Sequence, residues 1–123
     1  MLISANPAPG GTWYENTYPG ARVDVGNHFY CYSFEPADHW SEFFARQPEL
    51  QAYFRRVMER HELAPHIRWE TEVVGAAWDE DRNTWTVETR AADGVAETHE
   101  ARAVISAVGQ LNRPKLPDIP GRD

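Results

Sequence analysis

One short run, residues 10–24, combines residue types that could bind a flat or charged ligand. It reads Gly-Gly-Thr-Trp-Tyr-Glu-Asn-Thr-Tyr-Pro-Gly-Ala-Arg-Val-Asp. Gly10 and Gly11 carry no Cβ, so their backbone can approach such a ligand closely. Ring faces and fixed charges follow at Trp13, Tyr14, Tyr18, Arg22 and Asp24. This run is therefore the first candidate for a binding site.

A second candidate lies near the end of the sequence, where the apolar run 103–108 stops at Gly109 and a proline-rich segment follows. An apolar run of this length that ends at glycine is typical of a strand covered on both faces. Ligands of open α/β sheets bind beyond the carboxyl ends of such strands. We therefore expect Gly109 and Gln110 to lie at a site, and residues 109–123 to form a linker.

The first run resembles the cofactor loop of flavin-dependent monooxygenases of the Baeyer–Villiger class, whose pattern is Gly-Gly-Thr-Trp-Tyr-x-Asn-x-Tyr-Pro-Gly-x-Arg-x-Asp. Every fixed position of that pattern is met. The second stretch is similar to the family's Ala-x-Gly-Gln-Leu strand end and the Pro-Lys-Leu-Pro-x-Ile-Pro-Gly segment after it. Residues 106–113, with Glu15, Thr17 and Val23, look most like the 4-hydroxyacetophenone monooxygenase branch. The resemblance covers residues 10–121.

This resemblance implies an α/β fold: part of an FAD-binding, Rossmann-like domain with two helices and a small antiparallel β-sheet. It also implies an oxidoreductase that uses FAD, NADPH and O2 to insert one oxygen atom into a small-molecule ketone, giving an ester or lactone. One alternative is an N- or S-oxygenating flavin monooxygenase, which shares the fold. The other is a truncated, non-enzymatic remnant.

The resemblance further implies roles for named residues. Asp24 is the predicted catalytic residue, because the family's aspartate at this position orients an arginine supplied by a later domain. Alternatively, Asp24 stabilises a turn near Gly20 and Gly26, and Trp13 anchors the core. Arg22 either braces the loop or touches the cofactor. The predicted cofactor-binding residues are Gly11, Thr12, Trp13, Asp24, Tyr30, Val73, Gly109 and Gln110.

Two family features are missing from the sequence. It contains no Gly-x-Gly-x-x-Gly fingerprint, which places a pyrophosphate at a helix N-terminus. The family's Phe-x-Gly-x-x-x-His-x-x-x-Trp segment would begin after Asp123. We therefore expect an internal segment of a longer enzyme, inactive by itself, with residues 109–123 leading to an NADP-binding domain. Ser4 stands where the family carries a ribose-binding glutamate, so either that site is altered or the start of the chain is ragged.

The composition limits the classes of function. The 123 residues suffice for one small domain. The formal net charge of −7 argues against nucleic acid as a partner. Cys31 is the single cysteine, so no internal disulfide can form, which favours a reducing cytoplasm. No apolar run approaches the length of a membrane span, and the five histidines show no metal-ligand spacing, so neither a membrane nor a metal is an expected partner.

Residues 38–64 form the predicted helical segment. A short helix is expected near 38–44, and a longer helix begins at Pro48 and ends before Pro65. The longer helix carries apolar residues at helical spacing, which predicts one face turned to a core. Those residues are Leu50, Tyr53, Phe54, Val57 and Met58. The preceding segment, 28–34, is expected to be a short strand or extended arm.

The remaining regions complete the predicted organisation. Residues 1–34 form the cofactor-loop region. Residues 67–108 form a β-meander, which begins with a hairpin of strands 71–78 and 84–89 because both runs alternate with period two around a polar turn. A third strand over 98–108 is expected to begin at a sheet edge and end as the buried strand.

Overall fold

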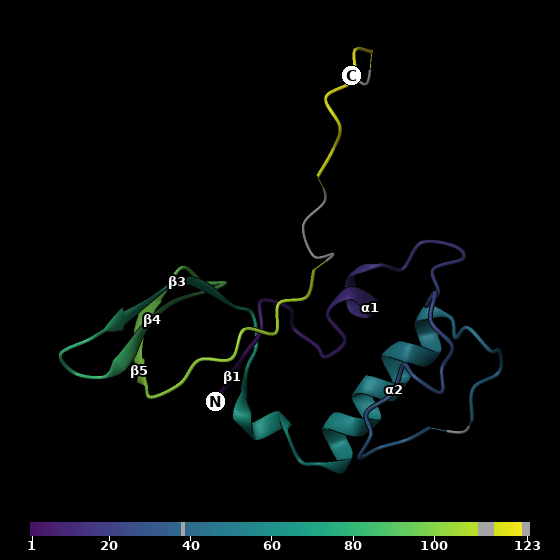
Figure 1. Cartoon of the computed structure of the whole chain (residues 1–123), viewed down its shortest axis with the longest axis horizontal. Helices are drawn as coiled ribbons and strands as arrows, with labels where there is room; N and C mark the ends of the chain where they lie inside the picture. Colours follow the sequence, from purple (N-terminus) through teal and green to yellow (C-terminus); the bar gives the residue numbers. More distant parts are fainter. Residues whose placement is uncertain (38, 111–114, 122–123) are drawn as a thin grey trace.

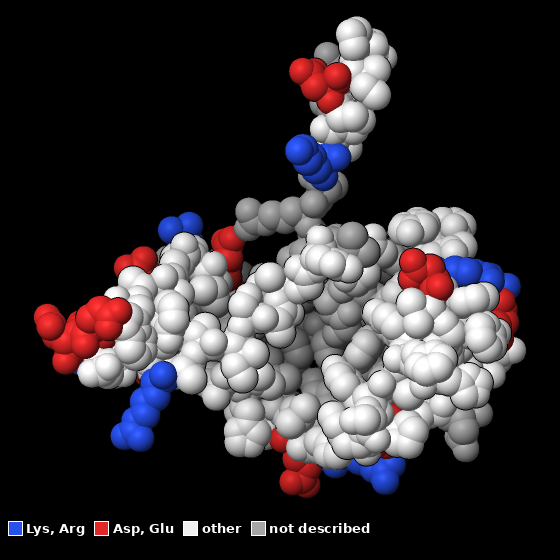
Figure 2. Space-filling model, in the orientation of Figure 1, with Lys and Arg blue, Asp and Glu red and all other residues white. Residues whose placement is uncertain are grey.

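The computed structural model describes residues 1–37, 39–110 and 115–121, and it places most of them in two parts (Figure 1). One part is a three-stranded sheet, and the other holds two helices with the loops that pack on them (Figure 1). Residues 115–121, which belong to the predicted linker, lie away from both parts. Figure 2 shows charged side chains around the edge of one face and uncharged side chains lining the hollow between the two parts.

Helix α2, Gln47–Arg60, confirms the predicted amphipathic helix. Pro48 lies in its first turn, where the missing N–H costs nothing. Leu50, Tyr53 and Val57 are buried, and the other two residues of the apolar stripe are half-buried. The stripe therefore faces the core as expected. Within the described residues, no helix is both long and apolar enough to cross a bilayer.

The chain turns sharply after helix α2. Glu62 adopts a φ of 51°, and the N–H of Leu63 donates to the carbonyl of Met58 at 2.9 Å. This left-handed residue and its hydrogen bond form a Schellman motif, which ends a helix by pairing its last carbonyls. The helix thus ends before Pro65, as predicted, but at Arg60 and through this motif, not through the proline. Pro65 lies in a separate 3-10 helix, η1 (Ala64–His66).

The short helix predicted near 38–44 does not form over the described residues of that range; position 38 itself lies outside them. The chain forms bends over residues 41–44 and is bonded to an earlier segment. The N–H of Val23 donates to the carbonyl of Ala45 at 3.0 Å, and the N–H of Asn27 donates to the carbonyl of Phe43 at 3.1 Å. These partners are distant in sequence, so local spacing could not reveal them.

The strand or extended arm predicted over residues 28–34 is also wrong, because this segment consists mainly of turns. The N–H of Phe29 donates to the carbonyl of Gly26 at 2.9 Å, and the N–H of Tyr30 donates to the carbonyl of Asn27 at 3.2 Å. These turn bonds shorten the segment and bring Tyr30 back against the helical part of the molecule.

The sheet consists of three antiparallel strands in the order β3 (Thr71–Asp79), β4 (Thr84–Ala91) and β5 (Ala96–Ala101). The predicted hairpin is thus confirmed. Trp78 lies opposite Trp85, and their ring centroids are 5.6 Å apart. Strand β5 corresponds to the first half of the predicted third strand.

The second half of that prediction fails. Residues 103–108 form no strand, and Ile105 and Val108 are 92% and 71% exposed. An apolar run becomes a buried strand only when other elements cover it, and none of the described residues does so here. The parallel pairing in the described chain is limited to β1 (Leu2–Ile3) beside β2 (Ile67–Arg68).

Candidate functional site

The two glycines before helix α1, Thr12–Glu15, have different surroundings. A Cβ on Gly10 would lie 2.2 Å from the side-chain oxygen of Gln51, so this glycine makes room for helix α2. A Cβ on Gly11 would meet no described atom within 4 Å, and its φ of 49° lies in the left-handed region that glycine favours. A flat ligand can therefore approach the backbone at Gly11, whereas the corresponding space at Gly10 is filled.

Trp13 and Tyr30 form a hydrogen-bonded aromatic pair. The indole Nε1–H of Trp13 donates to Tyr30 Oη at 2.9 Å, and the rings meet edge to face with centroids 6.0 Å apart. An indole N–H can only donate, so Tyr30 Oη is the acceptor and keeps its own proton for another partner. Trp13 is 8% exposed and packs against Val23, Ala45 and Leu50. Trp13 therefore anchors the core, which is the alternative to flavin contact that the sequence left open.

The segment that carries Asp24 alternates between buried and exposed residues. Ala21 and Val23 are buried, whereas Arg22 and Asp24 are exposed. This period of two is that of an extended chain packed on one side. The N–H of Gln47 donates to the carbonyl of Ala21 at 2.9 Å and fixes the segment beside the start of helix α2. The packing of two small apolar side chains thus turns the Asp24 carboxylate outward.

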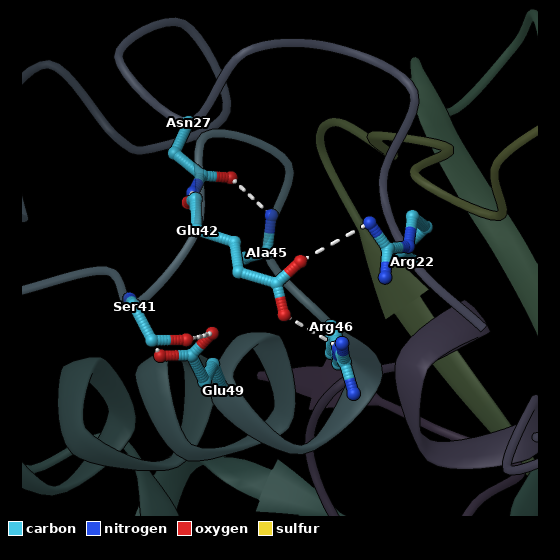
Figure 3. Close-up of polar contacts among 7 residues, drawn as sticks. All are labelled: Arg22, Asn27, Ser41, Glu42, Ala45, Arg46 and Glu49. Atoms are coloured by element: carbon cyan, nitrogen blue, oxygen red, sulfur yellow. Dashed lines mark hydrogen bonds and ion pairs between the residues drawn. The ribbon is translucent and has the colours of Figure 1, made fainter. Parts of the chain in front are cut away.

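Asn27 ties this segment to the chain before helix α2 (Figure 3). Its Nδ2 donates to the carbonyl of Glu42 at 2.7 Å, and its Oδ1 accepts from the N–H of Ala45 at 2.9 Å. Asn27 is 1% exposed, so these bonds satisfy polar groups that water cannot reach. The sequence analysis missed this residue, because an asparagine beside a glycine has the composition of an exposed turn.

Glu42 holds two arginines (Figure 3). Its Oε2 lies 3.2 Å from Nη1 of Arg22, and its Oε1 lies 2.6 Å from Nε of Arg46. Arg22 therefore braces the loop, which is one of its two predicted roles. The Asp24 carboxylate forms no hydrogen bond or ion pair with the described residues, so the turn-stabilising alternative finds no support.

Ser41 and Glu49 provide a test of the pH dependence of stability. The backbone N–H and hydroxyl of Ser41 donate to the Glu49 carboxylate at 3.0 and 2.9 Å (Figure 3). These hydrogen bonds, the backbone one foremost, lower the pKa of Glu49. A carboxyl group with a lowered pKa stabilises the fold above its unfolded-state pKa, and this contribution is lost as the pH falls through the folded-state pKa. Because the pair is partly exposed, we expect Glu49→Gln to lower the free energy of unfolding by less than about 1 kcal/mol at about pH 7.

The measurement is urea unfolding at about pH 7 and about pH 3, on either side of the usual carboxyl pKa. The difference between Glu49→Gln and the wild type should shrink at the lower pH. The control is Glu59→Gln, an exposed position on the same helix. An equal difference at both pH values would contradict the assignment.

The other predicted cofactor-binding residues are dispersed. Thr12 is exposed at the start of helix α1, and Val73 is exposed on strand β3, where the register shifts between Val73 and Gly75. Gly109, with a φ of 75°, and Gln110 are exposed beyond the sheet. No hydrogen bond among the described residues joins any of these four predicted residues to the Trp13–Tyr30 pair.

Tyr30 also lines an aromatic hollow of about 250 Å³. Tyr53 at its wall accepts a hydrogen bond from the N–H of Tyr32 and donates one to the carbonyl of Glu35, both at 2.8 Å. Burial raises the pKa of Tyr53 and so keeps its hydroxyl neutral. The hollow offers ring faces to an apolar ligand. Its lining residues are Phe29, Tyr30, Cys31, Tyr32, Tyr53 and Phe54.

Comparison with known proteins shows close similarity over almost the whole chain. No protein-family model matches it. A Baeyer–Villiger monooxygenase of Streptomyces coelicolor is 43% identical over 123 residues, which are 100% of this chain and 23% of that protein. The phenazine N-monooxygenase PhzNO1 of Lysobacter antibioticus is 40% identical over 118 residues, which are 93% of this chain and 21% of that protein. The structure of OTEMO in complex with FAD and NADP matches with a TM-score of 0.83 at 37% identity, over 98% of this chain and 23% of that one.

The chain is thus similar in sequence and structure to a segment of proteins of one class, the flavin-dependent monooxygenases. Within that class it is similar to named Baeyer–Villiger monooxygenases, as its motifs predicted. The chain spans about a fifth of the length of the curated relatives it matches. The predicted fold of two helices with a small antiparallel sheet is confirmed, although the second helix is α1 and not the one expected near 38–44.

Proposed function

We propose that this chain forms one wall of the FAD site in a Rossmann-like domain of a Baeyer–Villiger monooxygenase. The observation that carries the proposal is the open backbone face at Gly11, next to the Trp13–Tyr30 pair. A flat ring system needs a surface that no Cβ interrupts, together with a few fixed polar groups at its edge. Gly11 provides the open surface, and the hydroxyl of Tyr30 provides one of the polar groups.

When bound, FAD supplies the oxygen-transferring chemistry after reduction by NADPH. The residues of this chain would hold and orient that cofactor. Thr12 offers a hydroxyl and a backbone N–H, and Tyr30 offers a proton that its bond to Trp13 leaves free. Gln110 offers both a donor and an acceptor to a ring edge, while Val73 and Gly109 are exposed residues that a ligand could contact.

Asp24 has a different role in this proposal. Its carboxylate is exposed, and the ion pair between Arg22 and Glu42 leaves it without a cation among the described residues. We assign it the task of holding an arginine that another segment supplies, because a carboxylate orients a guanidinium through paired hydrogen bonds. The arginine would then lie beside the cofactor in a fixed position.

The proposed reaction is oxygenation of a small ketone by O2, giving an ester or lactone. The single cysteine, Cys31, supports a reducing cytoplasm as the location. Oxygenation at nitrogen is a second candidate, and the 40% identity to a phenazine N-monooxygenase favours it specifically. Both reactions use the same flavin site, so both predict flavin contact at Gly11.

Two glycine substitutions test this contact. Gly11 and Gly20 both have positive φ, and a Cβ at either position would meet no described atom within 4 Å. Gly11→Ala and Gly20→Ala therefore both place a methyl group in open space at a positive-φ position but differ in their relation to the proposed site. In an NMR titration of the chain with riboflavin 5′-phosphate, we expect shifts at Gly11, Thr12 and the Trp13 indole. Gly11→Ala should weaken binding at least about tenfold, which corresponds to about 1.4 kcal/mol, and Gly20→Ala should leave it unchanged.

The wild-type chain is the decisive sample. If it folds cooperatively and shows no shifts with riboflavin 5′-phosphate, the flavin-site proposal is wrong and a non-enzymatic remnant becomes the better interpretation. Equal weakening by both alanine variants would also contradict the proposal, because backbone strain alone would then explain it.

A further inference from the structure

Two glutamines on one face of helix α2 hold the glycine loop at both ends. Gln47 donates from Nε2 to the carbonyl of Trp13, and Gln51 donates from Nε2 to the carbonyl of Pro9 at 2.7 Å. Residues four apart on a helix lie on the same face. The two side chains therefore reach the same loop, one before its glycines and the other after them.

Close packing supports this contact at Gln51. Its side-chain oxygen lies only 2.2 Å from the position that a Cβ of Gly10 would take, so only glycine fits there with Gln51 in this position. The same oxygen is buried and has no hydrogen-bond partner among the described residues. Leaving a buried acceptor unpaired is unfavourable. The side chain is thus held in place by its bond to the Pro9 carbonyl and by its packing over Gly10, although its oxygen stays without a hydrogen bond.

The loop needs such support because its two glycines are intrinsically mobile. Gly10 and Gly11 adopt φ values of 121° and 49°, and glycine loses more conformational freedom on ordering than any other residue. Both glutamines belong to helix α2, whose buried face fixes it in the core through Leu50. A loop bonded at two points to a rigid element keeps one geometry.

We infer that Gln47 and Gln51 form a clamp that positions Gly11 and Trp13 for the flavin. This inference rests on the proposed function, because it gives the two glutamines a role in flavin binding. They are positioning residues, since they act through the loop and not on the ligand. Neither glutamine was singled out by the sequence, where each resembles an ordinary polar residue near a helix start.

The test uses Gln51→Glu and Gln47→Glu, which keep the shape of the side chain. A carboxylate cannot donate to a carbonyl, whereas a protonated carboxyl can. At about pH 7.5 we expect each variant to bind riboflavin 5′-phosphate about tenfold more weakly than the wild type. Amide hydrogen exchange at Trp13 and Tyr14 should be faster by a similar factor.

Lowering the pH should restore the flavin affinity of the two glutamine variants. As each introduced glutamate gains a proton, it regains a donor, so the ratio of variant to wild-type affinity at the same pH should return towards one. Ala52→Glu is the matched control, because Ala52 is exposed on the same helix and its replacement adds the same single titratable carboxyl group. Its ratio should stay near one at every pH. Urea unfolding of each variant shows that the samples compared are folded.

The outcomes separate the two proposals. If the wild type binds no flavin, the proposed function fails, and amide exchange still reports whether the glutamines hold the loop. If the wild type binds flavin and both glutamine variants behave like Ala52→Glu, the clamp is wrong while the flavin site stands. A loss of affinity that does not recover with pH also overturns the clamp, because it would not depend on the donor.

Discussion

Replacing Tyr53 with alanine should lower the free energy of unfolding by about 4 kcal/mol, the largest effect that we expect from a single substitution. Tyr53 is 1% exposed, and its ring centroid lies 5.4 Å from those of both Trp40 and Phe54. Its removal leaves a large cavity at the centre of the buried face of helix α2. It also leaves the N–H of Tyr32 without its hydroxyl partner.

Urea unfolding followed by tryptophan fluorescence measures this loss. Tyr53→Phe is the control, because it keeps the ring and removes the hydroxyl that bonds Tyr32 and Glu35. We expect that variant to lose about 1 to 3 kcal/mol, the cost of two hydrogen bonds. A Tyr53→Ala variant as stable as Tyr53→Phe would show that ring packing contributes little at this position.

Replacing Asn27 with alanine should lower the free energy of unfolding by about 3 kcal/mol. The substitution leaves the carbonyl of Glu42 and the N–H of Ala45 without their side-chain partners. Each buried polar group left unpaired costs about 1 to 3 kcal/mol, which is more than the loss of an exposed bond. The effect reaches the proposed site as well, because Asn27 fixes the segment that carries Asp24.

Chemical denaturation again provides the measurement, with Asn16→Ala as the matched control. Asn16 donates from Nδ2 to the carbonyl of Thr12 at 2.8 Å in an exposed position. We expect its removal to cost less than about 1 kcal/mol, because water can replace the bond. If the two alanine variants were equally stable, burial of Asn27 would not be the source of its contribution.

The elements that sequence analysis predicted correctly are those whose pattern is local. The apolar stripe of helix α2 is set by residues three and four apart, and the hairpin of β3 and β4 by alternation around one polar turn. The turn at Glu62 that follows the end of the helix was missed, because a non-glycine residue in the left-handed region carries no clear sequence signal. The family resemblance was likewise readable from two continuous motifs, and similarity to known monooxygenases confirms it.

The candidate site likewise has a part that the sequence predicts and a part that it does not. Its residue types were visible in the sequence, but their partners were not. Trp13 bonds Tyr30, and Glu42 bonds Arg22, through contacts that join separate segments. Only the folded chain distinguishes Gly10, which accommodates a glutamine, from Gly11, which stays open.

By itself, the sequence indicated the similarity to flavin-dependent monooxygenases, the amphipathic helix and the hairpin, because each depends on residues that are neighbours along the chain. The tertiary structure decided the rest. Backbone bonds from Val23 and Asn27 tie down the chain at Ala45 and Phe43, and no helix forms over the described residues of the range near 38–44 where local spacing favoured one. The apolar run 103–108 stays exposed, because a buried strand requires covering elements that the described residues do not provide. At these two places, contacts between distant segments or their absence decided the structure, because local spacing carries no information about them.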